Sequence, residues 1–433
     1  MSDLPPADAA PSTQTGGSGG PGPLRLAVTT PWYPGANNAF AGVFVQHAIE
    51  AVQAVDADAV DVRIIHAEDW ATPKDPMAWR IVRAGMHALL APGSPAAAPV
   101  RVREGELLRV RVPAVPRRGA LRHATFHVDE VRRLLPGGVI DADVLHAHEG
   151  LFGGLVATRL AAPETPIVVT EHDTRLKALL TSPDARSAYR DIIERSSRFF
   201  AVSEMLADQI RGYIPACADR IEVLPNAVAF EQMPMRQTPV SALDRWLYVG
   251  RLNPHKGVRR LVSAFAACAQ DNPRLTLTMI GSGPLQVELA QRAHDLGVGE
   301  RVDFRGPVPH EGVRAAMQSH DLLVHLSERE TFGMTIVEAI STGLPVLVTR
   351  SGGPQETLEG LGTMAGRLID VGTNRDGWDI DEVVETYHDM ANRIEDLDLH
   401  RAREILLDRY GQISVGRRLL EVYQQLRTGK AAS

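Results

Sequence analysis

Residues 321–348 constrain the fold most strongly, because they have the pattern of a strand, a polar segment, a helix and a second strand. Residues 321–327 form a short, leucine-rich apolar run that predicts a buried strand. Apolar residues then keep helical spacing until Gly343, and residues 344–348 begin the next strand. In an open parallel sheet, ligands bind at the carboxyl edge of the strands. We therefore expect residues 330–339, between the first strand and the body of the helix, to lie at a binding edge.

This segment contains groups suited to a phosphorylated ligand. Gly333 allows a ligand to approach the backbone, and the amides of Gly333, Met334 and Thr335 are expected to be unpaired donors at a helix amino terminus. Glu338 lies about one turn beyond Met334, where its carboxylate can accept hydrogen bonds from a ribose diol. Glu330 precedes the helix and is expected to face whatever is attached to the far phosphate. The alternative is that the two glutamates only complement the helix dipole and the solvent.

A second motif combines a strand, a glycine and two cations. Residues 246–249 predict a strand, which is followed by Gly250, Arg251 and Lys256. Both cations could face a diphosphate, Arg251 as a fork and Lys256 as a compact charge. A glycine turn at residues 281–284 follows another predicted strand, but it lacks the residues of a P-loop or of a dinucleotide fingerprint.

Together with residues 351–356 and 224–228, these motifs resemble the retaining glycosyltransferases of family 4. The resemblance extends from about Leu24 to about Arg427 and is densest between Tyr248 and Glu356. It implies an α/β protein of the GT-B fold, in which two Rossmann-like, doubly wound parallel-sheet domains face a central cleft. It also implies that the segment around Arg305, Gly306 and Val308 borders the nucleobase.

The chain length also predicts two domains, because 433 residues exceed one ordinary core. Residues 1–23 are expected to be a disordered tail, since they are rich in Pro, Ala, Gly and Ser. The expected domains are an acceptor-side domain at 24–229 and a nucleotide-sugar-binding domain at 245–410. The linker is placed at 230–244, and a final helix at 411–433 is expected to cross back to the first domain.

The resemblance gives each candidate residue an expected role. The expected donor-binding residues are Gly42, Gly250, Arg251, Lys256, Gly281, Gly306, Val308, Glu330, Phe332, Gly333, Met334, Thr335 and Glu338. In the family a glycine-rich loop follows the first strand, and only Gly42 clearly matches it here, with Ala41 where a second glycine is common. The expected catalytic residues are His172, Glu330, Arg251 and Lys256. Gly42 could instead be a simple helix-start glycine.

Two histidines are predicted at carboxyl strand ends of the first domain. His172 follows the strand 167–170, as the family's active-site histidine does. His148 and Glu149 follow the strand before it and are expected to line the acceptor side, whereas His146 is interpreted as structural. No HxxxH or HExxH spacing supports a metal site among these residues.

No catalytic metal is predicted. The DxD spacings at 56–58, 141–143 and 379–381 lie at strand or helix beginnings and are interpreted as structural. We therefore expect metal-independent transfer without a cofactor, in which Arg251, Lys256 and the helix amides stabilise the leaving diphosphate.

The predicted reaction moves a sugar from a nucleotide-diphosphate sugar, with UDP or GDP as the expected nucleotide, to a hydroxyl group of a glycan, a lipid-linked sugar or a small metabolite. Two alternatives remain open. One is an epimerase or phosphorylase of the same fold. The other is a protein that binds sugar nucleotides without catalysis.

Charge and composition limit the remaining partners. The net charge of −7 argues against general nucleic-acid binding. The sequence predicts no signal peptide or membrane span, which favours a cytoplasmic protein. Nine arginines between residues 80 and 122 could meet an anionic acceptor or the inner membrane face, although a solvated surface explains them equally well. Cys217 and Cys268 support neither a disulfide framework nor a zinc site.

Overall fold

The computed structural model describes residues 22–35, 41–70, 75–113, 119–370, 373–374, 377–378 and 380–431. The predicted tail up to residue 21 lies outside the described residues, as do Arg117, Arg118 and Asp379. No described helix combines the length and the hydropathy that a membrane span needs.

The first half of the chain builds an eight-stranded sheet in the order β3-β4-β2-β1-β5-β6-β7-β8. All neighbours pair in parallel except β3 and β4. Its strands are β1 (Leu24–Thr30), β2 (Val60–Trp70), β3 (Val100–Val102), β4 (Gly105–Pro113), β5 (Val144–His148), β6 (Ile167–Glu171), β7 (Arg198–Ala201) and β8 (Ile221–Val223). Its helices are α1 (Val43–Val55), α2 (Pro76–Leu89), α3 (Ala120–Leu134), α4 (Leu155–Leu160), α5 (Leu176–Leu179), α6 (Pro183–Arg195) and α7 (Glu204–Tyr213).

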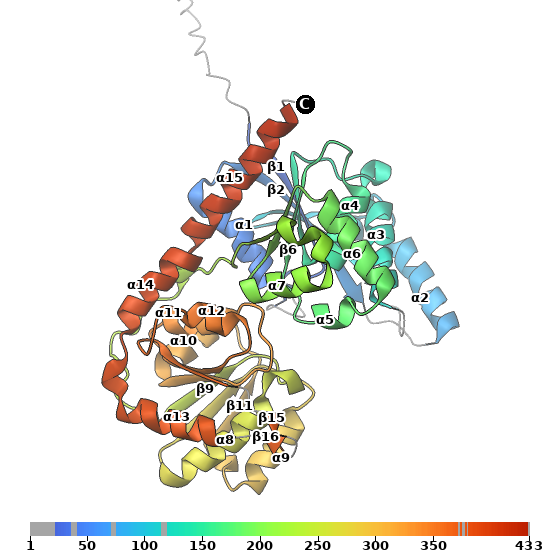
Figure 1. The fold of residues 1–433 in the computed structure, drawn as a ribbon. Coiled ribbons are helices and arrows are strands. Elements are labelled where there is room, and N and C mark those ends of the chain that lie inside the picture. The colour runs from blue at the N-terminus through green and yellow to red at the C-terminus, as the bar shows by residue number, and fades with distance from the viewer. Residues whose placement is uncertain are drawn as a thin grey trace, which may run out of the picture.

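The second half repeats this plan with a six-stranded parallel sheet in the order β11-β10-β9-β12-β13-β14 (Figure 1). Its strands are β9 (Arg245–Val249), β10 (Thr276–Ile280), β11 (Val302–Gly306), β12 (Leu322–His325), β13 (Val346–Thr349) and β14 (Gly366–Ile369), and β15 (Thr373–Asn374) pairs with β16 (Gly377–Trp378) apart from this sheet. Its helices are α8 (Val258–Asp271), α9 (Gln286–Asp295), α10 (His310–Ser319), α11 (Met334–Ser341), α12 (Gly353–Leu358) and α13 (Asp381–Asn392). Both strand orders are those of doubly wound sheets, which confirms the predicted fold class.

The last two helices connect the halves. Helix α14 (Leu399–Tyr410) lies beside the second domain, and α15 (Gln412–Ala431) runs along the first domain beside α1 (Figure 1). Val415, Leu419 and Tyr423 share one apolar cluster with residues of β1 and α1. A side chain at Gly416 would lie 1.9 Å from the carbonyl oxygen of Ala51, so the two helices touch backbone to backbone. The chain's end therefore completes the core of its first domain.

The arginine-rich region differs from an open basic face, because part of it is strand β4. Leu108, Val110 and Val112 point into the core and alternate with arginines on the other face. Several of the nine arginines have local partners. Arg83 pairs with Glu130, Arg103 with Glu50, Arg109 bonds His66, and the Arg111 guanidinium lies 4.3 Å from the Trp70 ring centroid. Several of these arginine charges are therefore already paired within the fold.

One predicted helix begins differently. The sequence pattern predicts a regular helix from Phe152, but a π-helical turn over Glu149–Gly154 precedes α4. Glu149 has φ 66°, and it is the only non-glycine residue with positive φ in the described part of the chain. Such a backbone is costly for a side-chain-bearing residue and concentrates at functional sites.

Candidate functional site

Three predicted glycines lie side by side at the carboxyl edge of the second sheet. The amide of Gly250 donates to the Ile280 carbonyl at 3.0 Å, and the amide of Gly281 donates to the Gly306 carbonyl at 2.9 Å. At Gly281, where φ is 127°, a Cβ atom would lie 2.0 Å from the Gly250 oxygen. The edge is therefore bare backbone, which a flat or anionic ligand can approach closely. Val308 lies just beyond β11, half-buried against the core.

Lys256 and Glu330 form an ion pair at this edge. Their Nζ and Oε2 atoms are 2.5 Å apart, and only 12% and 14% of their side chains are exposed. Burial alone would raise the pKa of Glu330, but the Lys256 ammonium and the His325 ring outweigh it and lower the pKa. Glu330 therefore stays a carboxylate. Arg251 is exposed beside this pair and has no ion pair with any described residue.

Helix α11 begins with Gly333 in a left-handed conformation at φ 87°. Met334 and Thr335 open the helix, where backbone N–H groups have no carbonyl one turn back. The positive end of the helix thus lies a few residues after Glu330, the partner of Lys256. The Phe332 side chain is 5% exposed and packs edge-on against Tyr410 at 5.1 Å, so it offers a ligand mainly its backbone.

Glu338 is the unusual carboxylate of this helix. It is 8% exposed, and its side chain makes no hydrogen bond or ion pair with the described residues. Burial raises its pKa to about 7, although Arg314 opposes the shift. Its carboxylate oxygens do not belong to the described side-chain atoms that are both fully buried and unpaired, so water or a ligand can reach them. Glu338 is therefore suited to hold a hydroxyl-bearing ligand.

His172 and His148 lie together in the first domain, as predicted. His148 Nδ1 is 3.0 Å from His172 Nε2, and the Phe44 ring stacks on His172 with centroids 4.1 Å apart. Burial lowers the pKa of His172 to about 3, against the opposing effect of the Asn226 side chain, and burial also lowers the pKa of His148. Both rings are therefore neutral near pH 7. Gly42, with φ 67°, begins the helix that carries Phe44.

His146 has the structural role predicted for it. Its Nδ1 atom lies 2.6 Å from the Tyr423 hydroxyl, and its Nε2 atom lies 2.8 Å from the Thr170 hydroxyl. Both ring nitrogens are thereby satisfied in the core. The ring packs 4.3 Å from His148, so α15 supports the candidate site from behind.

Glu149 is held in the strained turn by Glu171, the last residue of β6. The buried Glu171 carboxylate accepts hydrogen bonds from the amides of Gly150 and His172 and from the Tyr189 hydroxyl, which fixes the turn. Glu149 itself is 6% exposed, and its Oε2 atom has no hydrogen-bond partner. Burial, followed by the nearby carboxylates of Asp173 and Glu171, raises its pKa well above the usual range.

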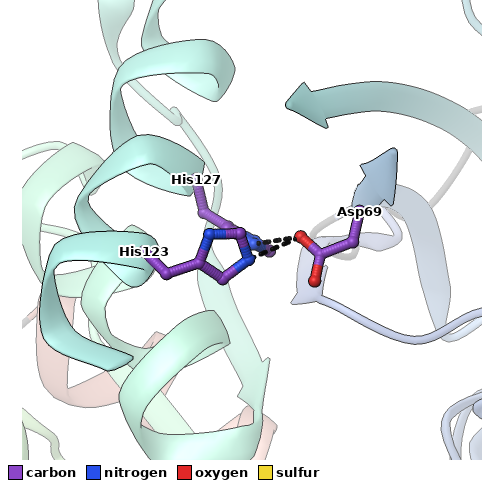
Figure 2. A group of neighbouring side chains, drawn as sticks. All are labelled: Asp69, His123 and His127. Atoms are coloured by element: carbon purple, nitrogen blue, oxygen red, sulfur yellow. Dashed lines mark hydrogen bonds and ion pairs between the residues drawn. The ribbon is translucent and has the colours of Figure 1, made fainter. Parts of the chain in front are cut away.

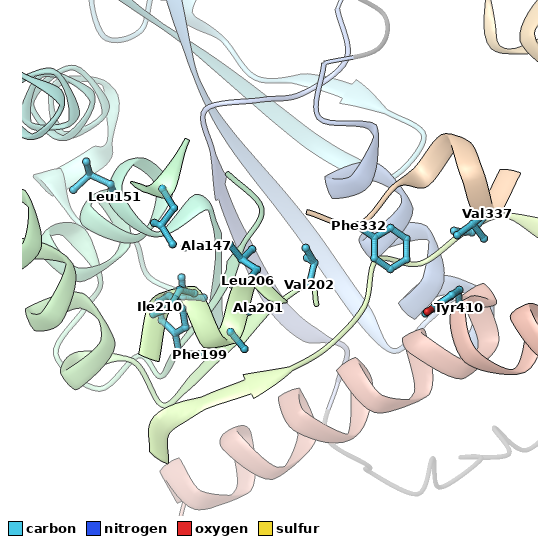
Figure 3. Packing of buried hydrophobic residues seen from close by; sticks show 14 of the residues in the cluster. Ala147, Leu151, Phe199, Ala201, Val202, Leu206, Ile210, Phe332, Val337 and Tyr410 are labelled. Atoms are coloured by element: carbon cyan, nitrogen blue, oxygen red, sulfur yellow. The ribbon is translucent and has the colours of Figure 1, made fainter. Parts of the chain in front are cut away.

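Two hydrogen-bonded contacts join the domains at the site. The Thr331 hydroxyl donates to the His172 carbonyl at 3.1 Å. The Glu356 carboxylate accepts from the amides of Glu204 and Met205 at 2.9 Å each, and so binds the start of α7. Figure 3 shows Phe332 between Val202 of the first domain and Val337 of α11. The two groups of predicted residues therefore face the same interdomain junction.

A cavity lies beside this junction rather than at the glycine edge. It encloses about 310 Å³ and is lined by residues such as Ser203, Glu204, Phe332, Glu356 and Tyr410. Phe332 is the only predicted donor-site residue that lines it. Arg251, Lys256 and Glu338 do not line it.

The two described aspartate pairs with DxD spacing have structural partners. Arg25 bonds both Asp141 and Asp143, and Asp56 closes a turn with the amide of Asp58. Likewise, Ser203 caps α7 through the Leu206 amide, and the two cysteines are buried and free.

One cluster was absent from the sequence prediction. Asp69, His123 and His127 converge at the carboxyl end of β2 (Figure 2). Its signal was present in the sequence, because two histidines four residues apart share one face of a helix. The aspartate, 54 residues earlier, could be assigned only from the structure.

Comparison with known proteins identifies relatives over most of the chain. The family model described as "Glycosyltransferase Family 4" matches residues 45–232, and "Glycosyl transferases group 1" matches residues 241–394. The chain is 26% identical to the 2-deoxystreptamine glucosyltransferase of Streptomyces kanamyceticus, over 53% of this chain and 64% of that protein. It is 28% identical to the D-inositol 3-phosphate glycosyltransferase of Pseudarthrobacter chlorophenolicus, over 72% and 77%.

A solved structure supports the same fold. Anabaena HepE in complex with UDP-glucose superposes with a TM-score of 0.64 at 18% identity, covering 93% of this chain and all of that one. The sequence matches cover less than two thirds of several relatives, the Streptomyces enzyme among them.

The raised pKa of Glu338 predicts a pH-dependent stability. The folded carboxyl holds its proton up to about pH 7, whereas the unfolded one loses it near 4.5. Wild-type stability should therefore fall as pH rises through this window. Glu338→Gln has no ionisable group at this position, so its free energy of unfolding should not fall in this way. As pH rises through the window, the difference between the variant and wild type should change in favour of the variant by up to about 3 kcal/mol. Urea unfolding across the window measures this, with the exposed Glu311→Gln as control. Parallel profiles for wild type and Glu338→Gln would contradict the assignment.

Proposed function

Because the chain belongs to glycosyltransferase family 4 and has the GT-B fold, we propose that it transfers a sugar from a nucleotide-diphosphate sugar to a hydroxyl group of an acceptor. The observation that carries the proposal is the junction itself. One domain carries the Lys256–Glu330 pair, the start of α11 and Glu338. Thr331 of the same domain donates a hydrogen bond to the carbonyl of His172 on the other domain.

The proposed donor is a UDP-sugar. The HepE structure of the same fold contains UDP-glucose, which supports this nucleotide over GDP. The bare edge at Gly250, Gly281 and Gly306 suits a planar base recognised by backbone groups. Glu338, one turn into α11, would accept hydrogen bonds from the ribose hydroxyls. Because burial raises its pKa to about 7, a proton partly neutralises its charge near neutral pH, and the carboxyl group needs no cationic partner there.

The proposed mechanism stabilises the leaving diphosphate without a metal ion. As the bond from the anomeric carbon to the phosphate oxygen breaks, negative charge grows on the diphosphate. Arg251, Lys256 and the amides of Met334 and Thr335 supply positive potential there. The acceptor oxygen forms the new bond on the same face, with retention, and its proton passes to the departing phosphate oxygen. Glu330, held by Lys256, would bind the hydroxyls of the donor sugar.

His172 would act as a neutral hydrogen-bonding group beside the sugar. With its pKa near 3, the ring is not a permanent cation at physiological pH. His148 and Glu149 lie next to it and would line the acceptor side. The relatives named above carry names of small polyhydroxylated acceptors, which supports a small-molecule acceptor, while glycans and lipid-linked sugars remain alternatives.

The donor site predicts a selective loss of nucleotide affinity. Arg251→Ala should weaken UDP binding at least ten-fold, because a charge-assisted contact to phosphate contributes more than about 1.4 kcal/mol. Arg274→Ala is the matched control, since Arg274 is exposed and pairs with Asp244 beside the amino end of β10. Isothermal titration with UDP measures both affinities, and stabilisation by UDP, GDP and dTDP compares the bases. Equal affinities in the two variants would refute the assignment.

The site also predicts that His172 affects turnover rather than donor binding. His172→Ala should lower kcat at least about 100-fold while UDP affinity stays near wild type. The exposed His294→Ala serves as control. Steady-state assays with the donor and acceptor selected by screening would measure this. Unchanged turnover would remove His172 from the mechanism, and conversion of the sugar nucleotide without acceptor would favour an epimerase.

Transfer should require neither Mg²⁺ nor Mn²⁺. Arg251, Lys256 and the α11 amides already supply the positive potential that such ions provide elsewhere. Adding either ion to protein freed of divalent cations should leave the initial rate unchanged. A strict dependence of the rate on either ion would refute this part of the mechanism.

A further inference from the structure

A cluster of two histidines and one aspartate lies outside the site described above. His123 and His127 project from the first half of α3, and Asp69 lies near the end of β2 (Figure 2). Both Nε2 atoms point at the same carboxylate oxygen, Asp69 Oδ1, at 2.8 and 3.0 Å. All three ligand-type atoms lie within 4.8 Å of one another.

The histidine rings are held in place by packing. Their centroids lie 5.0 Å apart, and the Phe152 ring lies 5.8 Å from that of His123 and 5.2 Å from that of His127. The spacing of four residues puts both on one face of α3. The helix and the aromatic contact therefore preorganise the two nitrogens toward one point, as a metal site requires.

Hydrogen bonding does not fully account for the cluster. His123 Nδ1 and His127 Nδ1 are buried and have no hydrogen-bond partner. The single Asp69 oxygen Oδ1 receives both rings. Both Nε2 atoms thus face one oxygen, where a bound cation would attract the carboxylate and the two nitrogen lone pairs together.

We propose that Asp69, His123 and His127 bind one divalent transition-metal ion, of which Zn²⁺ is the representative, through Oδ1 and the two Nε2 atoms. Imidazole and carboxylate suit Zn²⁺, Co²⁺ and Ni²⁺ rather than Mg²⁺. Ligand bonds of about 2.0–2.2 Å place tetrahedral donors about 3.3–3.6 Å apart. Metal binding would therefore move each ring roughly half an ångström farther from Asp69 Oδ1 than the 2.8 and 3.0 Å present.

The site has an open side. The Asp69 side chain is 50% exposed and that of His123 is 15% exposed, whereas His127 is buried. Three protein ligands leave a fourth position for water or an anionic group. Phe152 belongs to the turn Glu149–Gly154, so a bound ion would tie β2 and α3 to the turn that carries Glu149. This proposal is independent of the proposed transfer reaction.

Metal binding by the tag-free full chain tests the proposal. The protein is freed of metal with a chelator, and isothermal titration with ZnCl₂ near pH 7.5 is combined with elemental analysis after dialysis. Wild type should bind one Zn²⁺ per chain at this site, and binding should weaken at acidic pH, because protonated imidazole does not ligate. Asp69→Asn and His127→Ala should weaken this binding at least ten-fold.

His388→Ala is the matched control, because His388 also lies near an aspartate, Asp271, but on the surface of the second domain at 3.7 Å. It should bind Zn²⁺ as wild type does. Co²⁺ added to wild type should give visible absorption of a low-coordinate site, a readout that needs no variant. The proposal fails if wild type retains no Zn²⁺ and gives no such absorption, which would leave a hydrogen-bonded triad only. It also fails if Asp69→Asn binds as tightly as His388→Ala.

Discussion

The structure depends on how residues 330–333 are held from several sides at once. The Glu330 amide donates to Ser351, its carbonyl accepts from Gly353, and its carboxylate pairs with Lys256. One residue later, Thr331 bonds the His172 carbonyl of the other domain. Gly333 then turns into a left-handed conformation that starts α11. These contacts fix the conformation of the loop, and they therefore also fix the orientation of the start of α11.

The charges around this loop divide into satisfied and unsatisfied groups. The buried Glu171 carboxylate accepts hydrogen bonds from the amides of Gly150 and His172, and Glu330 pairs with Lys256, so each is tied to the structure near it. Glu338 and Glu149 have fewer partners among the described residues, and the pKa of each is raised. A buried oxygen without a partner, such as Glu149 Oε2, carries a free-energy cost that a ligand can relieve.

The sequence predicts most of the second domain, because its short apolar runs, glycines and helical patterns follow one another regularly. It fails where distant segments meet. Strand β4 was missed because Arg109 and Arg111 alternate with its apolar residues. The left-handed turn at Glu149 depends on Glu171 and Tyr189. Asp69 joins two histidines far along the chain, and His146 is satisfied by Tyr423, 277 residues away. Local patterns cannot contain such pairings.

The return of α15 to the first domain has a consequence for biosynthesis. Val415, Leu419 and Tyr423 belong to the same apolar cluster as β1 and α1, so that cluster stays incomplete while the ribosome is still translating the intervening residues. The second domain, by contrast, has all six strands of its sheet emerged earlier. Nascent chains usually fold from the first domain onward. In this protein we expect the reverse order for this cluster. The second domain can pack its core first, and the first domain completes the apolar cluster beside α1 only after α15 has been synthesised.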